Sequence, residues 1–185
     1  MGKIFKEIDP TLIDFIKRQK MFFVATSPLS ADGHVNLSPK GLDTFRVLGP
    51  QSVSYLDLTG SGVETIAHLK ENGRITIMFC AFEGAPRILR LYGRGEVIEP
   101  KHPGFSTLRQ SFGEHLGVRA IIRVLVSRIA DSCGYAVPLY DFVAERDTLT
   151  KYSQNKGEEG LCKYRNERNA KSLDGLTGLE PVNGR

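Results

Sequence analysis

The segment LDLTGSGVETIAHLKENG, Leu56–Gly73, contains residues suited to holding an anion. A strand-like apolar run ends, the small-residue loop Thr59-Gly60-Ser61-Gly62 follows, and a helical pattern starts directly after it. Backbone N–H groups at a helix amino terminus are unpaired and carry partial positive charge, so hydroxyls and close-approaching glycines placed there favour a phosphate. The alternative is structural: Ser61 caps the helix and the glycines form a tight turn.

A second polar row lies in the strand-like stretch HVNLSPK. The strand period of two places Asn36, Ser38 and Lys40 on one face, where an amide, a hydroxyl and a cation point the same way. If this strand neighbours Tyr55–Thr59, its row converges on the TGSG loop, which favours a phosphate over a helix cap alone. Neither a Walker phosphate loop nor a dinucleotide GxGxxG pattern is present.

Short elements must position these residues. The capping and apolar patterns predict helices from Asp9-Pro10 to near Lys20, from the TGSG loop to a stop at Asn72-Gly73, around Pro103–Phe112, and at Glu158–Arg168. The β-type runs predict a hairpin over Met21–Lys40 and strands at Asp43–Leu48, Ser52–Leu58, Ile75–Phe82, Arg87–Pro100 and Ala120–Val126. The strand Ile75–Phe82 is almost continuously apolar, which predicts burial on both faces.

Strands broken by turns, with only short helices between them, favour an antiparallel arrangement over a doubly wound parallel sheet. We therefore predict a mainly β fold, a β-barrel with flanking helices. The 185 residues, 41% of them hydrophobic, suit a single domain over 1–185. Residues 146–185 are polar and aliphatic-poor, and we expect them to form a C-terminal extension packed on that domain.

Composition excludes several classes of function. The formal charge is only +4 and the basic residues are scattered, so nucleic acid is not an expected partner. No apolar run is long enough to span a bilayer and the start MGKIFKEIDP lacks a secretory core, so we expect a soluble, cytoplasmic protein without membrane contact. Three cysteines and four dispersed histidines give no metal-binding pattern, and we expect no metal.

The strand VNLSPK, the strand entering a Gly-Ser loop with a helix behind it, NGRITIMF and RILRLYGRGEV together resemble the pyridoxamine 5′-phosphate oxidase-like flavin proteins. The resemblance spans roughly Ile13–Pro100 and implies an FMN-binding split β-barrel that forms homodimers with FMN between subunits. It implies cofactor contacts from the polar row of the strand HVNLSPK and from the family's phosphate-binding segment, which falls on Asp57–Thr65 here. The resemblance assigns Ser38, Lys40, Thr59, Ser61 and Thr65 to the cofactor. The spacing of the strand, the loop and the matching segment add Asn36, Asp57, Gly60 and Gly62 to the predicted site.

Three departures from the family pattern qualify this inference. The Arg-Lys pair expected at the helix start is replaced by Glu64-Thr65, so the phosphate loses two cations. The family's RQVR strand reads Arg87-Ile88-Leu89-Arg90, so the glutamine that touches the flavin ring is absent. The carboxy-terminal Arg-x-His substrate motif has no counterpart in LDGLTGLEPVNGR. We therefore expect weakened FMN binding and no oxidation of pyridoxamine phosphate.

Arg87 or Arg90 could place positive charge near N1 and the C2 carbonyl of a flavin; the alternative is an ordinary solvated strand face. Cys133 and Tyr135, in SCGYAVPLY, could line the flavin pocket; the alternative for Cys133 is a buried structural thiol. His68 falls on the side of its helix that we expect to be solvated.

Three functions remain open from sequence. The first is an FMN-dependent oxidoreductase acting on a small-molecule substrate or electron donor. The second is a flavin-binding or flavin-sensing protein without turnover. The third is a barrel that has lost its cofactor.

Overall fold

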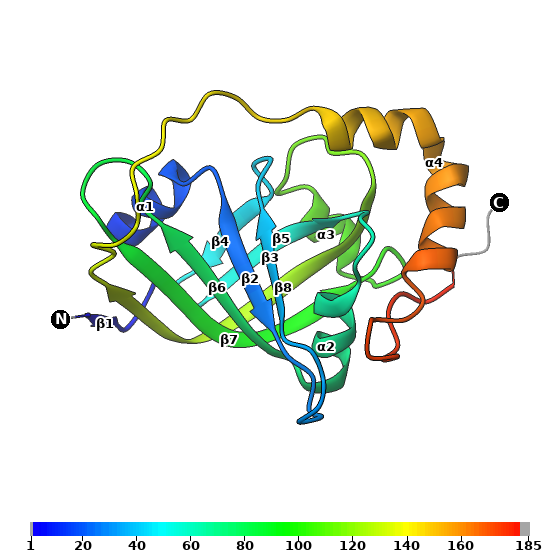
Figure 1. Ribbon diagram of the computed structural model, residues 1–185, viewed down its shortest axis with the longest axis horizontal. Helices are drawn as coiled ribbons and strands as arrows, with labels where there is room; N and C mark the ends of the chain where they lie inside the picture. Colours follow the sequence, from blue (N-terminus) through cyan, green and yellow to red (C-terminus); the bar gives the residue numbers. More distant parts are fainter. Residues whose placement is uncertain (1, 182–185) are drawn as a thin grey trace.

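Eight antiparallel strands form one sheet in the computed structural model, which describes residues 2–181 of the chain (Figure 1). The strands are β1 (Ile4–Phe5), β2 (Phe22–Thr26), β3 (Asn36–Lys40), β4 (Phe45–Gly49), β5 (Ser52–Leu58), β6 (Arg74–Cys80), β7 (Ile88–Ile98) and β8 (Val118–Ser132). Four helices flank them: α1 (Pro10–Arg18), α2 (Glu64–Asn72), α3 (Phe105–Arg109) and α4 (Thr148–Arg168). The predicted mainly β fold with flanking helices is confirmed.

The order of the strands in the sheet is β3-β2-β6-β7-β8-β5-β4, and β1 pairs with β8. This order leaves β3 and β4 as the edges, and the sheet curls around a core that includes Val24, Tyr55, Ile77 and Leu91. The Lys40 side chain at the end of β3 reaches Asp57 on β5 across the opening of the barrel. The barrel is therefore split beside the polar side chains Asn36, Ser38 and Lys40 of β3, which we call the β3 row, as the resemblance implied.

Local sequence signals explain the helix ends. Asp9 caps α1 by accepting a hydrogen bond from the Leu12 N–H at 2.8 Å, and Pro10 occupies the first turn. Gly73 ends α2 in the left-handed conformation at φ 70°, where its N–H bonds the Leu69 carbonyl. Both predicted helices are confirmed, although α1 ends at Arg18 rather than near Lys20.

Three sequence-based expectations need correction. In β6, buried and half-buried residues alternate, so the prediction of burial on both faces is wrong: only one face meets the barrel interior. Strand β8 extends from Val118 to Ser132, well beyond the predicted Ala120–Val126, because it pairs with both β5 and β7. Helix α4 begins at Thr148, ten residues before the predicted start, and only its second part, after the kink at Gly157, is the predicted helix Glu158–Arg168.

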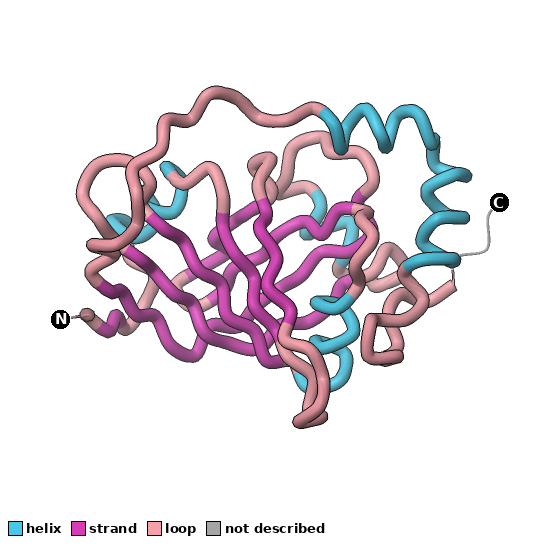
Figure 2. Tube along the Cα trace, viewed as in Figure 1, coloured by secondary structure: helices cyan, strands magenta, loops and turns pink. Residues whose placement is uncertain are grey.

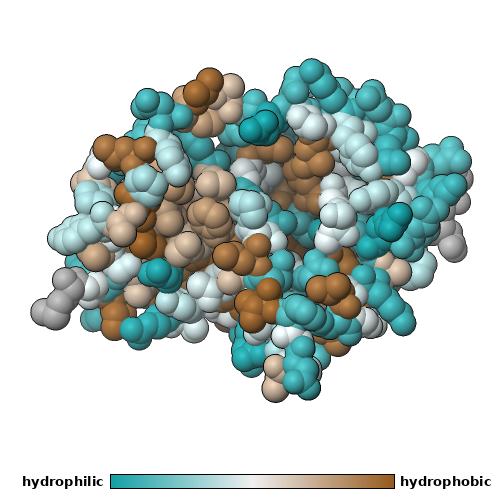
Figure 3. All heavy atoms as spheres, in the orientation of Figure 1, coloured by the Kyte–Doolittle hydropathy of each residue, from teal (hydrophilic) through white to brown (hydrophobic). Residues whose placement is uncertain are grey.

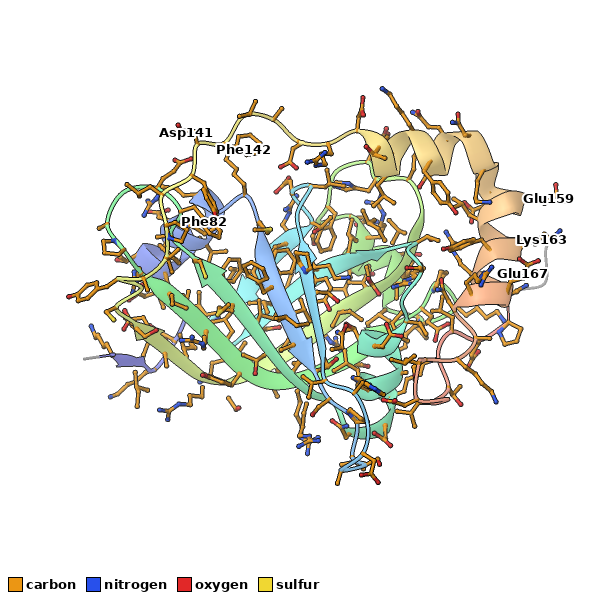
Figure 4. All side chains as sticks on the ribbon, viewed as in Figure 1. Phe82, Asp141, Phe142, Glu159, Lys163 and Glu167 are labelled. Atoms are coloured by element: carbon orange, nitrogen blue, oxygen red, sulfur yellow. The ribbon has the colours of Figure 1, made fainter. Side chains whose placement is uncertain are left out.

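An irregular segment, residues 133–147, connects β8 to α4; we call it the strap. It crosses above the end of the barrel as the long loop at the top of Figure 2. The outer face of α4 carries Glu159, Lys163 and Glu167, which point away from the barrel (Figure 4). Its other side carries the buried Leu161 and Arg165.

Helix α4 turns a corner at Gly157, whose φ of 62° and ψ of 175° are essentially restricted to glycine. We expect Gly157→Ala to destabilise the protein by about 1–3 kcal/mol through backbone strain, since open space surrounds the position where a Cβ would lie. Thermal or urea unfolding measures the change. Gly160→Ala, in the same helix but without positive φ, is the matched control, and equal effects of the two substitutions would contradict this account.

Residues 1 and 182–185 of the predicted single domain lie outside the described residues. Within the described range, the C-terminal extension contacts the barrel: Arg165 bonds Thr59, and the Gly178 carbonyl accepts a hydrogen bond from Lys70 at 2.6 Å. Over residues 2–181, no helix has the length and apolar character needed to cross a membrane.

Candidate functional site

A buried carboxylate lies between two cations at the split of the barrel. Asp57 is fully buried; its Oδ1 lies 3.1 Å from Lys40 Nζ and its Oδ2 lies 3.2 Å from Arg119 Nη2. The register of β5 and β8 skips Arg119, because Asp57 pairs with Ala120 and Leu58 pairs with Val118. Such a bulge re-aims a side chain, and here it brings the Arg119 guanidinium to Asp57.

Burial of Asp57 by itself raises the pKa of this carboxyl. The adjacent charges of Lys40 and Arg119, and their hydrogen bonds to it, outweigh burial and hold the pKa of Asp57 below 3.8. Asp57 is therefore ionised at neutral pH, and one of the two positive charges beside it is neutralised.

The lowered pKa of Asp57 predicts acid sensitivity. A carboxyl with a depressed folded-state pKa adds stability above its unfolded pKa, and that stability is lost as pH falls through the folded value. We expect the urea midpoint to fall between about pH 5 and about pH 2, and less steeply in Asp57→Asn, which cannot titrate there. The same slope in both proteins would show that other carboxyl groups control acid unfolding.

The TGSG loop is fixed through its carbonyl groups. Arg119 donates to the Gly60 carbonyl at 3.2 Å and to the Gly62 carbonyl at 2.7 Å. Asn169, just beyond α4, donates to the carbonyls of Gly60 and Ser61 at 2.9 and 3.3 Å. The alternative that Ser61 caps the helix is wrong: Val63 occupies the cap position of α2 and supplies no side-chain hydrogen bond.

Thr59 is already engaged within the protein. Its hydroxyl donates to the Gly117 carbonyl at 2.7 Å and accepts from Arg165 Nε at 2.9 Å, and its N–H bonds the same carbonyl. The Thr59 side chain therefore connects the TGSG loop to Gly117, just before β8, and to Arg165 on α4. These hydrogen bonds leave Thr59 less available to a phosphate than the sequence suggested.

The β3 row converges on the same region, as its spacing predicted. Asn36 Nδ2 lies 2.9 Å from the hydroxyl of Thr65 in the first turn of α2, while Lys40 reaches Asp57. Ser38, between them, donates to Asn36 Oδ1 at 3.0 Å. The structure thus brings together the β3 row, Asp57, the TGSG loop and Thr65.

Three other predicted cofactor residues lie away from this cluster. Arg87 forms an ion pair with Asp131 at 2.9 Å, and Arg90 donates to Ser132 at 2.9 Å. Cys133 is exposed, so the alternative of a buried structural thiol is wrong. The expectation that these residues lie beside the same ligand as Lys40 is not met within this chain, because they belong to the paired ends of β7 and β8.

A cleft of about 830 Å³ opens beside Lys40 and the TGSG loop, under the strap. In the space-filling view, the surface between the strap and the barrel is hollowed, with hydrophobic atoms inside the hollow (Figure 3). Phe82 lies below the strap, which carries Phe142 (Figure 4), and Phe82 stacks on Tyr140 with ring centroids 5.4 Å apart. The aromatic residues lining the cleft are Phe82, Tyr140, Phe142, Tyr152 and Tyr164.

Sequence reasoning missed Arg119, Arg165, Asn169 and the aromatic lining. The available signal for Arg119 was a glycine, Gly117, and then an arginine at the start of a strongly apolar strand; in the structure this glycine has a φ of 70°. The α4 residues carried no comparable signal, because their role depends on where the strap places the helix.

The prediction that His68 is solvated is wrong. Its side chain is fully buried and its Nδ1 lies 3.0 Å from the hydroxyl of Thr26 on β2. Helix α2 has the barrel on one side and the C-terminal loop on another, where the Leu173 N–H bonds Glu64. Within residues 2–181, no group of three or more metal-ligating side chains is found.

Comparison with known proteins places this geometry in a family. The family model described as pyridoxamine 5′-phosphate oxidase matches residues 8–133. The pyridoxamine 5′-phosphate oxidase family protein ustO of Aspergillus flavus is 40% identical over 199 residues, covering 97% of this chain and 78% of that protein.

Two solved structures share the fold at low sequence identity. HupZ of Group A Streptococcus aligns with a TM-score of 0.51 and 24% identity, over 66% of this chain and 91% of its own. A Clostridium acetobutylicum protein related to general stress protein 26, of the pyridoxinephosphate oxidase family, aligns with a TM-score of 0.51 and 12% identity, over 74% of this chain and 93% of its own. At this identity the likeness extends to the fold alone.

Proposed function

Since the chain belongs to the pyridoxamine 5′-phosphate oxidase family, we propose that it binds FMN in the cleft under the strap and acts as an oxidoreductase on a small molecule. The observation that carries the proposal is the make-up of this one cleft. Its lining combines Lys40 and the TGSG loop with five aromatic side chains. A ligand with a phosphate at one end and a planar ring at the other matches such a lining.

The size and lining of the cleft support FMN as its ligand. Its volume of about 830 Å³ lies within the range of about 300–1,000 Å³ usual for small-molecule sites. Aromatic walls favour a flat ring system and exclude water from it. These features support a flavin as the ligand of the cleft.

The candidate phosphate contacts are Lys40, the TGSG loop and the start of α2. Lys40 keeps 20% of its side chain exposed, and Ser61 lines the cleft. The first-turn N–H groups of α2, which no side chain caps, favour a nearby anion. Lys40 and Arg119 share Asp57, so the cluster of three carries one net positive charge. The lining of the cleft also includes Arg18, Lys20 and Arg146, so weakened FMN binding stays a prediction.

When bound, FMN supplies the electron-transfer chemistry itself. The part of this chain is to bind and orient it: Lys40 would hold the phosphate, and the aromatic residues would enclose the ring. The substrate or electron donor then enters the remaining part of the cleft. The absence of an Arg-x-His motif in LDGLTGLEPVNGR favours a substrate other than pyridoxamine phosphate.

Titration of the purified protein with FMN tests the proposal. We expect saturable quenching of flavin fluorescence, and stabilisation by about 2.7 kcal/mol when free FMN is 100 times its Kd. If FMN caused no quenching and no stabilisation, the protein would be a barrel that has lost its cofactor. Oxidation of a nicotinamide donor no faster than with free FMN would favour a flavin-binding or flavin-sensing protein without turnover.

We also propose that two copies associate through the outer face of β3 and the strap. Leu37, Leu139 and Val143 are 63%, 74% and 92% exposed, and β3 is an unpaired sheet edge. Sedimentation analysis is expected to give a dimer for the wild type and a larger monomer fraction for Leu37→Asp and Val143→Asp. A wild-type protein that stays monomeric at high concentration would refute this arrangement.

A further inference from the structure

A chain of buried hydrogen bonds connects helix α2 to the β3 row. His68 on α2 is fully buried, and its Nδ1 lies 3.0 Å from Thr26 Oγ1. Its Nε2 is buried without a hydrogen-bond partner among residues 2–181. The imidazole therefore makes its one side-chain hydrogen bond toward β2 and β3.

The chain continues from Thr26 to Ser38 through one amide. Asn36 Nδ2 donates to Thr26 Oγ1 at 3.3 Å and to Thr65 Oγ1 at 2.9 Å. Asn36 Oδ1 accepts a hydrogen bond from Ser38 Oγ at 3.0 Å. Four side chains, those of His68, Thr26, Asn36 and Ser38, thus form one path that ends at the half-buried Ser38.

The donors available allow one consistent direction for these bonds. Thr26 accepts from Asn36, and its own hydroxyl proton can then point at His68 Nδ1. In that arrangement Nδ1 is an acceptor, and a neutral imidazole carries its proton on Nε2. Burial lowers the pKa of His68, outweighing the opposite influence of Asp174, Glu64, Glu71 and a hydrogen bond with the backbone of Thr26, so the ring is neutral at pH 7.

This direction decides what Ser38 can offer a ligand. Its single proton is used on Asn36, so only its lone pairs remain for another group. If Nδ1 carried the proton instead, Thr26 could donate to a flipped Asn36, whose amide would donate to Ser38. The hydroxyl proton of Ser38 would then be free to reach a phosphate oxygen.

We propose that His68 is a positioning residue that acts through Thr26 and Asn36 to fix Ser38 as a hydrogen-bond acceptor beside the cleft, next along β3 to the cleft-lining Pro39 and Lys40. The group that meets Ser38 is then a hydrogen-bond donor, a hydroxyl or N–H group, while phosphate binding is left to Lys40 and the start of α2. The inference rests on the proposed function in one respect, namely that the ligand reaches Ser38.

The tautomer of His68 is measurable without any ligand. Long-range proton–nitrogen NMR correlations of the imidazole are expected to show the proton on Nε2 in the wild type. Thr26→Val, which removes the hydroxyl while keeping a similar shape, is expected to shift the tautomer populations, and Thr26→Ser is expected to restore them. A wild-type imidazole protonated on Nδ1, or a Thr26→Val spectrum identical to that of the wild type, would overturn the inference.

Affinities for FMN, riboflavin and lumiflavin test the consequence for the ligand. Riboflavin lacks the phosphate and lumiflavin also lacks the polyol chain, so the three probes separate these groups. Ser38→Ala is expected to weaken the binding of FMN and of riboflavin by the same factor, roughly 2- to 12-fold in Kd for one neutral hydrogen bond. The affinity for lumiflavin should stay unchanged. Thr26→Val should weaken the same two ligands, with recovery in Thr26→Ser.

The outcomes separate the two proposals. Loss confined to FMN would place the phosphate at Ser38 and overturn the assignment of Ser38 as an acceptor. Failure of the wild type to bind any of the three flavins would overturn the proposed function, whereas the NMR result would still decide whether His68 sets the direction of the chain.

Discussion

Arg119→Ala is expected to lower the free energy of unfolding by about 3–5 kcal/mol, the usual cost of removing one partner of a buried ion pair. The substitution removes one of the two cations beside Asp57, whose side chain has no exposed surface. It also removes the donors to the carbonyls of Gly60 and Gly62. Urea unfolding measures the loss, and we expect FMN affinity to fall with it because the TGSG loop loses its support.

Arg123→Ala is the matched control for this experiment. Arg123 lies four residues further along β8 and pairs with Glu96 at an exposed position, where ion pairs contribute about 0–1 kcal/mol. Similar losses for the two variants would show that the interaction between Arg119 and Asp57 has no special weight in this fold.

The second large effect is expected at Lys40. Lys40→Ala removes one charge-assisted contact with the phosphate and should weaken FMN by about 1.5–3 kcal/mol, roughly 10- to 150-fold in Kd. Fluorescence titration gives the Kd. Because Lys40 also pairs with buried Asp57, the unfolding free energy should fall as well, and both quantities need to be measured on the same variant.

Lys17→Ala controls for a general loss of positive charge. Lys17 lines a neighbouring cavity of about 510 Å³ and does not line the cleft that holds Lys40. The Kd of the Lys17→Ala variant for FMN should match that of the wild type. A Kd that is unchanged in Lys40→Ala would place the phosphate elsewhere.

Several elements were predictable because local signals determine them. Asp9-Pro10 starts α1, Asn72-Gly73 ends α2, and the period of two in Asn36–Lys40 places three polar side chains on one face. The family resemblance adds the split-barrel type of the fold and the place of the TGSG loop in the site. Together these predict the split barrel and the meeting of β3 with the start of α2.

The remaining features depend on tertiary placement. Arg119 is turned toward Asp57 by an irregularity of register that alternation along β8 does not reveal. Arg165 and Asn169 reach the TGSG loop only because Gly157 bends α4 and the strap carries that helix over the barrel. The apolar pattern of α2 predicts an exposed side for this helix. His68 on that side is buried because β2, through Thr26, and the C-terminal loop pack against the helix.

The charge balance of the site follows from these long-range contacts. Sequence reading left Lys40 as the main cation and counted the missing Arg-Lys pair as a loss. The structure adds Arg119 but commits it to Asp57 and to two loop carbonyls. Of the two cations beside Asp57, Lys40 is the one that lines the cleft. Its substitution should therefore lower the affinity for FMN more directly than that of Arg119.

The most direct test of this account is a crystal structure of the protein soaked with FMN. We predict electron density for the phosphate next to Lys40 and Ser61, and for the ring against the aromatic residues under the strap. FMN bound beside Arg87, Arg90 and Cys133 instead, with Lys40 contacting only Asp57, would contradict the central claim.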